Sequence, residues 1–140
     1  FRLAGTDATF GIPAAKLGIS YGFDGLSRLV QVAGPARTRY LLYTGDRVDA
    51  QTALTWGLVE QVHDTGVLWD EAMTLARRIA GNAPLSIRAT KETVAQITRD
   101  PADRDMQAIV DLSTLCQQSS DFREGRDAFR EKRSPVFTGQ

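Results

Sequence analysis

Asp24 is a candidate for proton transfer because aromatic and glycine residues surround it in the sequence, namely Tyr21, Gly22, Phe23 and Gly25. An aspartate held in an apolar pocket loses part of its hydration, which suits an acid or base that works near neutral pH. The same residue can instead cap the helix that follows, since Asp is a preferred N-cap residue. Both interpretations remain open at this point.

Three glycines, at positions 18, 22 and 25, lie close to Asp24. Glycine lets the backbone approach a ligand closely, and it also allows tight turns with no ligand involved.

The single histidine and the single cysteine are weaker candidates for chemistry. His63 is the single histidine and has no Ser, Cys or carboxylate constellation around it. Cys116 is the single cysteine, lies in a helical apolar pattern and is expected to be a small core residue in a reducing compartment. We expect no metal site.

The charge balance excludes several classes of partner. Seventeen Lys and Arg residues balance seventeen Asp and Glu residues among 140 residues, so no long-range field favours nucleic acid or an acidic membrane surface. No apolar run is long enough to span a bilayer, and nothing resembles a signal peptide. We therefore expect a cytoplasmic protein that binds neither nucleic acid nor membrane.

A series of short motifs follows in fixed order between Phe10 and Val62. They are Phe10-Gly11-Ile12-Pro13-Ala14, Gly18-Ile19, Gly22-Phe23-Asp24-Gly25, Arg28-Leu29, Gly34-Pro35, Thr44-Gly45-Asp46-Arg47, Asp49-Ala50-Gln51 and Trp56-Gly57-Leu58-Val59. Their order and spacing resemble the crotonase superfamily, the enoyl-CoA hydratases and isomerases. The segment from Phe129 to Phe137 looks like the closing segment of that family, so the resemblance covers nearly the whole chain.

This resemblance implies an acyl-CoA thioester as substrate and a reaction through an enolate. Such enzymes hold the thioester oxygen between two backbone N–H groups, which stabilise the developing negative charge without reorganising. Hydratases add two glutamates that move protons between water and the substrate. The second glutamate follows the proline of the Phe-Gly-x-Pro motif, and Ala14 occupies that position here. Because alanine cannot exchange a proton, ordinary hydration is compromised unless another residue supplies the acid or base.

The resemblance also indicates where the substrate would lie. The loop with Tyr21, Gly22 and Phe23 would line the acyl end of the pocket beside Ala14, with the Gly22 N–H near the catalytic water. Phe129 and Lys132 match an aromatic residue and a lysine on the last helix of the family that reach the adenine end of CoA, often in an adjacent subunit. A flat ring stacks on adenine and an ammonium pairs with phosphate, although an ordinary amphipathic helix would show similar residues. Coenzyme A is expected as part of the substrate, with no other cofactor.

The elements that position these residues follow from helix and turn signals. We expect a helix after Asp24 that ends at Gly34, a second one from Pro35 through Leu42, and a short one over 50–56 capped by Asp49. Residues 58–62 alternate as a strand. Helices are then expected over 68–80, from Pro84 to about Thr98, through Met106 to Leu115, and from Phe122 to about Lys132 with Asp121 as cap.

The resulting fold class is α/β, the C-terminal part of a crotonase-like ββα spiral core followed by a helical subdomain. Residues 1–62 form the core part and 63–140 the helical part, which we expect to cap CoA and to build a homotrimer or hexamer. The family is about twice as long, the chain begins at Phe1, and Phe1–Gly5 resembles the end of a buried strand, so we expect a fragment that lacks the first half. That half would hold the first glutamate and the oxyanion donors.

Two functions from different classes therefore remain. The first is an enoyl-CoA hydratase/isomerase family enzyme with altered acid/base chemistry. The second is a non-catalytic acyl-CoA-binding or scaffold homologue that kept the fold and lost its proton shuttles.

Overall fold

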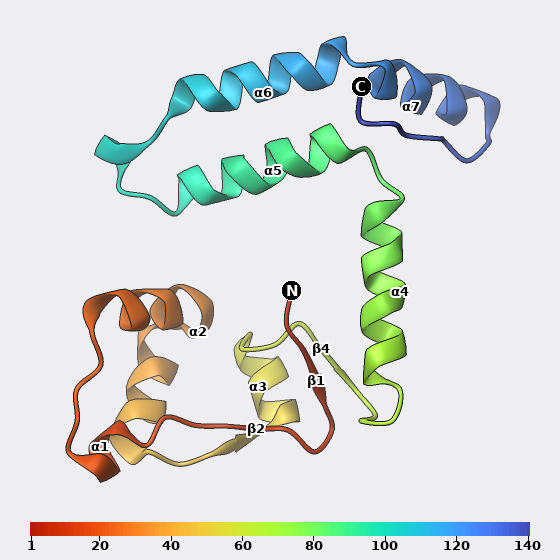
Figure 1. Ribbon diagram of the computed structural model, residues 1–140. Helices are drawn as coiled ribbons and strands as arrows, with labels where there is room; N and C mark the ends of the chain where they lie inside the picture. The colour runs from red at the N-terminus through yellow and green to blue at the C-terminus, as the bar shows by residue number, and fades with distance from the viewer. The chain divides into compact units, whose positions relative to one another are not determined.

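The computed structural model describes residues 1–140 and divides into two compact units, Phe1–Met73 and Thr74–Gln140 (Figure 1). The division falls inside helix α4, Leu68–Ala80, whose bounds agree with the predicted helix. The predicted domain boundary between residues 62 and 63 marks a change from sheet to helix, which need not coincide with a division into compact units. It stays a prediction.

Two short sheets organise the first unit. Strand β1, Leu3–Gly5, runs parallel to β4, Gln61–His63, and β2, Thr9–Phe10, runs antiparallel to β3, Val48–Asp49. Their small core consists of Ala4, Ala53 and Val59, flanked by half-buried apolar side chains. Because two-stranded sheets are marginal by themselves, this core depends on the helices that cover it.

The strand predicted over 58–62 forms only at its end. The N–H groups of Leu58 and Val59 donate to the carbonyl of Ala53, at 2.8 and 3.4 Å, and close the C-terminus of α3, Ala50–Trp56. Those two residues are therefore engaged in a helix end, and β4 begins at Gln61. The α3 helix itself has the predicted bounds. Its predicted cap is confirmed, since the Thr52 N–H donates to Asp49 Oδ1 at 2.7 Å.

Helix α1 spans Ala14–Leu17, and α2 spans Phe23–Thr44. The predicted break is confirmed, because Gly34 has φ 78° and ψ 163° inside α2, a conformation that favours glycine, and Pro35 starts the second half. The interpretation of Asp24 as a cap is wrong. Gly22 is the N-cap, no side chain caps this helix, and Asp24 lies in the first turn.

The second unit is helical. Helices α5, Pro84–Ile97, and α6, Met106–Gln118, lie side by side as a hairpin, joined through the 3₁₀ turn Pro101–Asp103 (Figure 1). The buried Gln96 ties the connection, because its side chain accepts from the Asp105 N–H at 2.8 Å and donates to Glu92 Oε1 at 2.6 Å. Helix α7 spans Ser120–Glu131.

The predicted cap of the last helix is also wrong. Ser119 is the N-cap, and its Oγ accepts from the Phe122 N–H at 3.0 Å. Asp121, which is 3% exposed, accepts instead from the backbone N–H groups of Thr138 at 2.7 Å and Gly139 at 2.8 Å. Its carboxylate thus holds the C-terminal segment against the start of α7.

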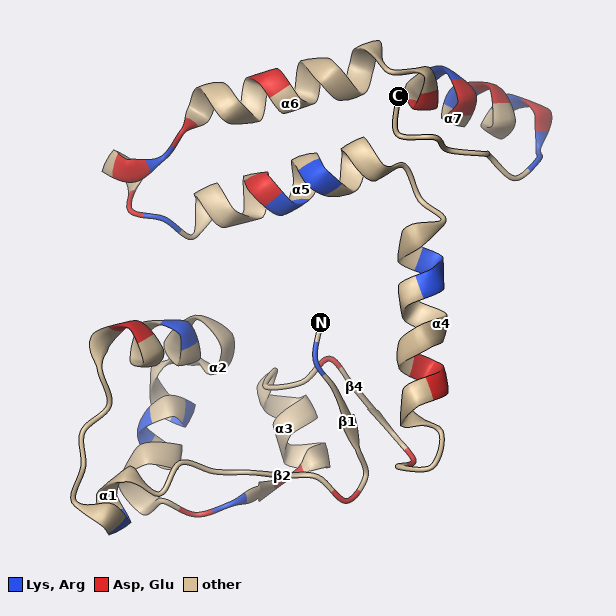
Figure 2. Cartoon of the chain, in the orientation of Figure 1, with Lys and Arg blue, Asp and Glu red and all other residues tan.

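Charge is distributed unevenly over the helices of the second unit. Acidic and basic residues are dense along α7, whereas α6 carries a single acidic residue, Asp111 (Figure 2). Neither α4 nor α6 contains a fully buried residue. None of the helices combines the length and the apolar character that crossing a bilayer requires.

Candidate functional site

The predicted glutamate position lies at the start of α1. Ala14 is its first residue and is 5% exposed, so a methyl group occupies a buried place. Its carbonyl accepts from the Ile19 N–H at 3.1 Å, which folds the loop back over the short helix. No proton can be exchanged at this side chain. The next residue, Ala15, is exposed and faces a different environment.

The remaining pocket residues form a loop with little internal support. Phe23 is 85% exposed and Tyr21 46% exposed, and Asp24 is also exposed. The helix that they begin has no side-chain cap. The structure therefore surrounds the Asp24 carboxylate with solvent rather than with the predicted apolar wall. Such a wall would have to come from a substrate or from another polypeptide segment.

Gly22 is the N-cap of α2, and its carbonyl accepts from the Leu26 N–H at 3.2 Å. Its N–H donates no hydrogen bond within the chain. A side chain at position 22 would meet no atom within 4 Å, and the φ of −68° is open to any residue. Nothing in the chain itself therefore requires glycine there. The role expected for Gly22, an N–H near the catalytic water, stays a prediction.

A separate apolar groove of about 670 Å³ lies elsewhere in the first unit. Phe10, Leu29, Leu41 and Val59 contribute to its walls, together with Phe1 and Leu3. None of the predicted pocket residues lines this groove. The structure thus brings Tyr21, Gly22, Phe23 and Asp24 together at the start of α2, and none of them lines this apolar groove.

In the second unit, the predicted CoA residues lie at the C-terminal end of α7. Phe129 is 88% exposed. Lys132 was predicted to lie on the last helix, but it is the C-cap of that helix. Its N–H donates to the Phe129 carbonyl at 3.3 Å. With φ 55° and ψ 38°, Lys132 is the only residue other than glycine with a positive φ. The ring and the ammonium therefore share one helix end.

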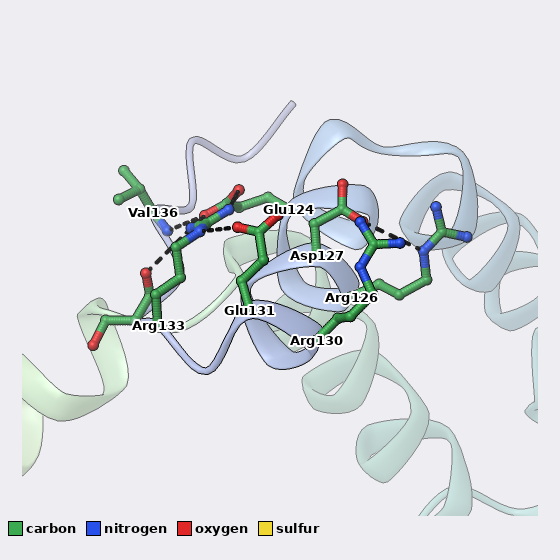
Figure 3. Close-up of polar contacts among 8 residues, drawn as sticks. Glu124, Arg126, Asp127, Arg130, Glu131, Arg133 and Val136 are labelled. Atoms are coloured by element: carbon green, nitrogen blue, oxygen red, sulfur yellow. Dashed lines mark hydrogen bonds and ion pairs between the residues drawn. The ribbon is translucent and has the colours of Figure 1, made fainter.

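An ion-paired cluster adjoins this helix end. The Arg133 guanidinium donates through Nη1 and Nη2 to the two oxygens of Glu124, at 2.6 and 2.8 Å, and through Nε to Glu131 at 2.7 Å (Figure 3). The Val136 N–H also donates to Glu124, at 2.8 Å. These hydrogen bonds, first from Arg133 and then from Val136, lower the pKa of Glu124 to about 2. The two carboxylates raise the pKa of Arg133.

Two further arginines of α7 are paired, whereas Arg123, near the start of the helix, is exposed and takes part in no ion pair. Arg126 and Arg130 both lie against Asp127, with nitrogen to oxygen distances of 3.9 and 3.3 Å (Figure 3). Lys132 takes part in no ion pair. The exposed ring of Phe129 therefore shares its helix end with one unpaired ammonium, a combination suited to a nucleotide base and its phosphate.

The residues that shape this end, Glu124 and Arg133, were missed by the sequence interpretation. They are nine positions apart, and Arg133 lies beyond the last helical residue, so helical periodicity does not place them on one face. The signal that could have found them is the Arg-Ser-Pro sequence after the helix, which directs the chain back along α7. No group of three or more His, Cys, Asp or Glu residues is arranged to hold a metal.

Comparison with known proteins adds a consistent result. The family model described as enoyl-CoA hydratase/isomerase matches residues 1–140. The chain is 37% identical over 137 residues to a crotonyl-CoA hydratase of Syntrophomonas wolfei, covering 98% of the chain and 53% of that protein. It is 36% identical over 144 residues to a carnitinyl-CoA dehydratase of Citrobacter koseri, covering 100% of the chain and 55% of the relative.

Solved structures agree with these sequence matches. An enoyl-CoA hydratase/isomerase family protein from Hyphomonas neptunium superimposes with a TM-score of 0.88 at 32% identity, over 99% of this chain and 53% of the other. The predicted fold class, α/β and the C-terminal part of a crotonase-like core followed by helices, is thereby confirmed. The chain spans about half the length of the relatives it matches.

Proposed function

Because this chain belongs to the enoyl-CoA hydratase/isomerase family, we propose that it acts on an acyl-CoA thioester through an oxyanion-stabilised enolate, with altered acid/base chemistry. The observation that carries this proposal is the family match over all 140 residues, which includes both the pocket loop and the last helix. The names of the relatives, a crotonyl-CoA hydratase and a carnitinyl-CoA dehydratase, support water addition or removal at a CoA thioester as the reaction class.

Ala14 supports the altered chemistry. A buried methyl group stands where the family places a glutamate, so the proton transfers of a two-glutamate hydratase need another group. We assign that role to Asp24. It is the carboxylate of the loop that carries the free Gly22 N–H, and its side chain makes no hydrogen bond that would withdraw it from a substrate. Tyr21 and Phe23 are the aromatic neighbours able to enclose it once a ligand covers the loop.

The CoA moiety is assigned to α7, where Phe129 would stack on adenine and Lys132 would pair with phosphate. The apolar helices that bury no residue of their own, α4 and α6, support assembly into a homotrimer or hexamer, because such faces pack against another surface. Light scattering on the protein at micromolar concentration should give a mass three or six times that of the monomer. A clean monomer would contradict the assembly.

A non-catalytic acyl-CoA-binding protein is the second candidate, and Ala14 together with the solvated Asp24 favours it. The two candidates are separated by hydrogen–deuterium exchange at the α-carbon of butyryl-CoA in D₂O, followed by NMR. This exchange needs an enolate and a proton carrier but no water addition, so it tests directly whether another group replaces the glutamate that is absent at position 14. Exchange above the protein-free rate supports the enzyme. Binding of CoA without exchange supports the binding protein, and absence of both excludes the acyl-CoA assignment.

A further inference from the structure

Lys132 adopts a backbone conformation that its residue type does not favour. A left-handed C-cap is normally occupied by glycine, since a Cβ crowds the backbone at positive φ. The other left-handed residues of the chain, at positions 18, 34, 45, 57 and 139, are all glycines. Strained residues persist where the surroundings hold them, and they concentrate at sites of binding or chemistry. We therefore ask which contacts hold the backbone of Lys132 in this conformation and what function its side chain serves there.

The restraint is visible in the contacts on both sides of Lys132. The N–H of Arg133 donates to the Ala128 carbonyl at 3.0 Å, which closes the helix end around Lys132. The Arg133 side chain then binds both oxygens of Glu124, about two turns back from the end of α7, as well as the carboxylate of Glu131 (Figure 3). Two-point arginine to carboxylate pairing fixes geometry as well as distance. We refer to Glu124, Glu131 and Arg133 as the α7 clamp.

At the C-terminal end of α7, the clamp pairs Arg133 and leaves Lys132 unpaired. All three donor nitrogens of the Arg133 guanidinium are engaged by carboxylates, so this side chain is not available to a ligand. Arg126 and Arg130 are committed to Asp127. Lys132 is exposed, unpaired and located at the helix end that carries the exposed Phe129 ring.

We propose that the α7 clamp is a positioning device that holds Lys132 left-handed, so that its ammonium stands ready for a phosphate of the adenine nucleotide of CoA beside Phe129. Glu124 and Arg133 are positioning residues that do not touch the ligand. The inference rests on the proposed acyl-CoA function. Its physical basis is preorganisation, because a backbone that already has its bound conformation does not have to be ordered when the ligand binds.

The test is a double-mutant cycle on CoA affinity, measured by isothermal titration calorimetry with CoA and with pantetheine, which lacks the nucleotide. Lys132→Ala should weaken CoA binding about tenfold, the effect of losing a hydrogen bond to a charged group. Glu124→Gln should weaken CoA binding about threefold to tenfold by releasing the backbone of Lys132. Neither change should affect pantetheine. In the Lys132→Ala background, Glu124→Gln should have no further effect, since the clamp acts through the lysine.

Two further variants separate positioning from simple stability. Lys132→Gly relieves the left-handed strain, so it should raise the thermal midpoint of the protein while it weakens CoA binding as Lys132→Ala does. Asp127→Asn is the matched control, because it removes an ion-pairing carboxylate from the same helix outside the clamp. Asp127→Asn should therefore not weaken CoA binding, in contrast to Glu124→Gln.

Each other outcome contradicts a defined part of the argument. If Glu124→Gln weakens CoA binding equally in both backgrounds, the clamp is only a structural support and the positioning role is wrong. If Lys132→Ala weakens CoA binding and Glu124→Gln does not, the lysine binds without the clamp and the acyl-CoA function stands. If neither change affects CoA binding, Lys132 does not contribute to CoA binding and the inference is wrong. If the wild-type chain binds no CoA, the proposed function fails together with it.

Discussion

The pocket loop of the first unit and the C-terminal segment of the second unit differ in how they are held. No side chain between Leu17 and Ala33 makes a hydrogen bond, and Phe23 is almost fully exposed. The segment from Ser119 to the C-terminus is tied at short intervals. Asp121 holds Thr138 and Gly139, Glu124 holds Arg133 and Val136, and the Gln140 carbonyl accepts from the Ser120 N–H at 2.6 Å.

This difference separates two kinds of site. The end of α7 is organised by the chain itself, so its geometry exists before any ligand arrives. The loop at the start of α2 has no such side-chain ties within the chain. Substitutions in the loop should therefore change chemistry and leave stability nearly intact, whereas substitutions at the polar ties of the C-terminal segment should lower stability.

The largest effect is expected at Ala14. Wild-type protein should hydrate crotonyl-CoA slowly, and Ala14→Glu should raise the rate on the order of a hundredfold, because it restores a general acid or base at the family position. The rate is followed by loss of the enoyl thioester absorbance. Ala15→Glu adds the same carboxylate at an exposed neighbouring position and should have no effect. Equal rates for all three proteins would show that position 14 is irrelevant to hydration.

A comparable effect is expected at Asp24. Replacing it by Asn should lower any α-proton exchange of butyryl-CoA on the order of a hundredfold, since the amide cannot carry a proton. Stability should fall by less than about 1 kcal/mol, because Asp24 interacts only with the positive end of α2 and does not cap it. Asp24→Glu keeps the ionisable group and serves as control. Unchanged exchange in Asp24→Asn would limit this residue to its electrostatic effect on the helix.

The opposite behaviour is expected at Asp121. Asp121→Ala should destabilise the protein by about 2–3 kcal/mol in urea unfolding, because it removes a buried carboxylate and leaves the backbone N–H groups of Thr138 and Gly139 without their charged acceptor. Asp127→Ala, a substitution at a half-exposed carboxylate on the same helix, should cost less than about 1 kcal/mol. Similar losses for both would mean that the C-terminal segment is not held by Asp121.

The smallest expected effect is the pH dependence of stability in acid that Glu124 contributes. Glu124 has a folded pKa of about 2 against an ordinary value of 4.5, so its protonated form is disfavoured in the folded protein. A lowered folded pKa gives a contribution to stability that is present above about pH 4.5 and is lost as the pH falls through 2. The stability difference between wild type and Glu124→Gln should therefore be constant from pH 7 to 5 and shrink below that. A difference that does not change between pH 5 and 2 would contradict the pairing with Arg133.

Local signals predicted the elements well where the chain decides its own structure. Helix α4 has the predicted bounds, Asp49 caps α3, and Gly34 with Pro35 breaks α2, because capping, glycine and proline act through bonds made within a few residues. Asp24 and Asp121 were assigned as caps by the same rule and are not. A capping residue competes with its neighbours, and Gly22 and Ser119 occupy the cap positions instead.

The sequence by itself determined the family, the fold class and the approximate positions of the helices, since motif order and residue type are properties of the chain. Only the tertiary structure decided that Asp121 anchors the C-terminal segment, that Lys132 has a left-handed backbone conformation, and that Arg133 is ion-paired with Glu124 and Glu131. The physical reason is that these features depend on a chain that reverses after α7. The reversal brings together groups that are distant in the sequence. Glu124 thereby pairs with Arg133, and Asp121 accepts from the backbone of the C-terminal segment, pairings that local sequence patterns do not specify.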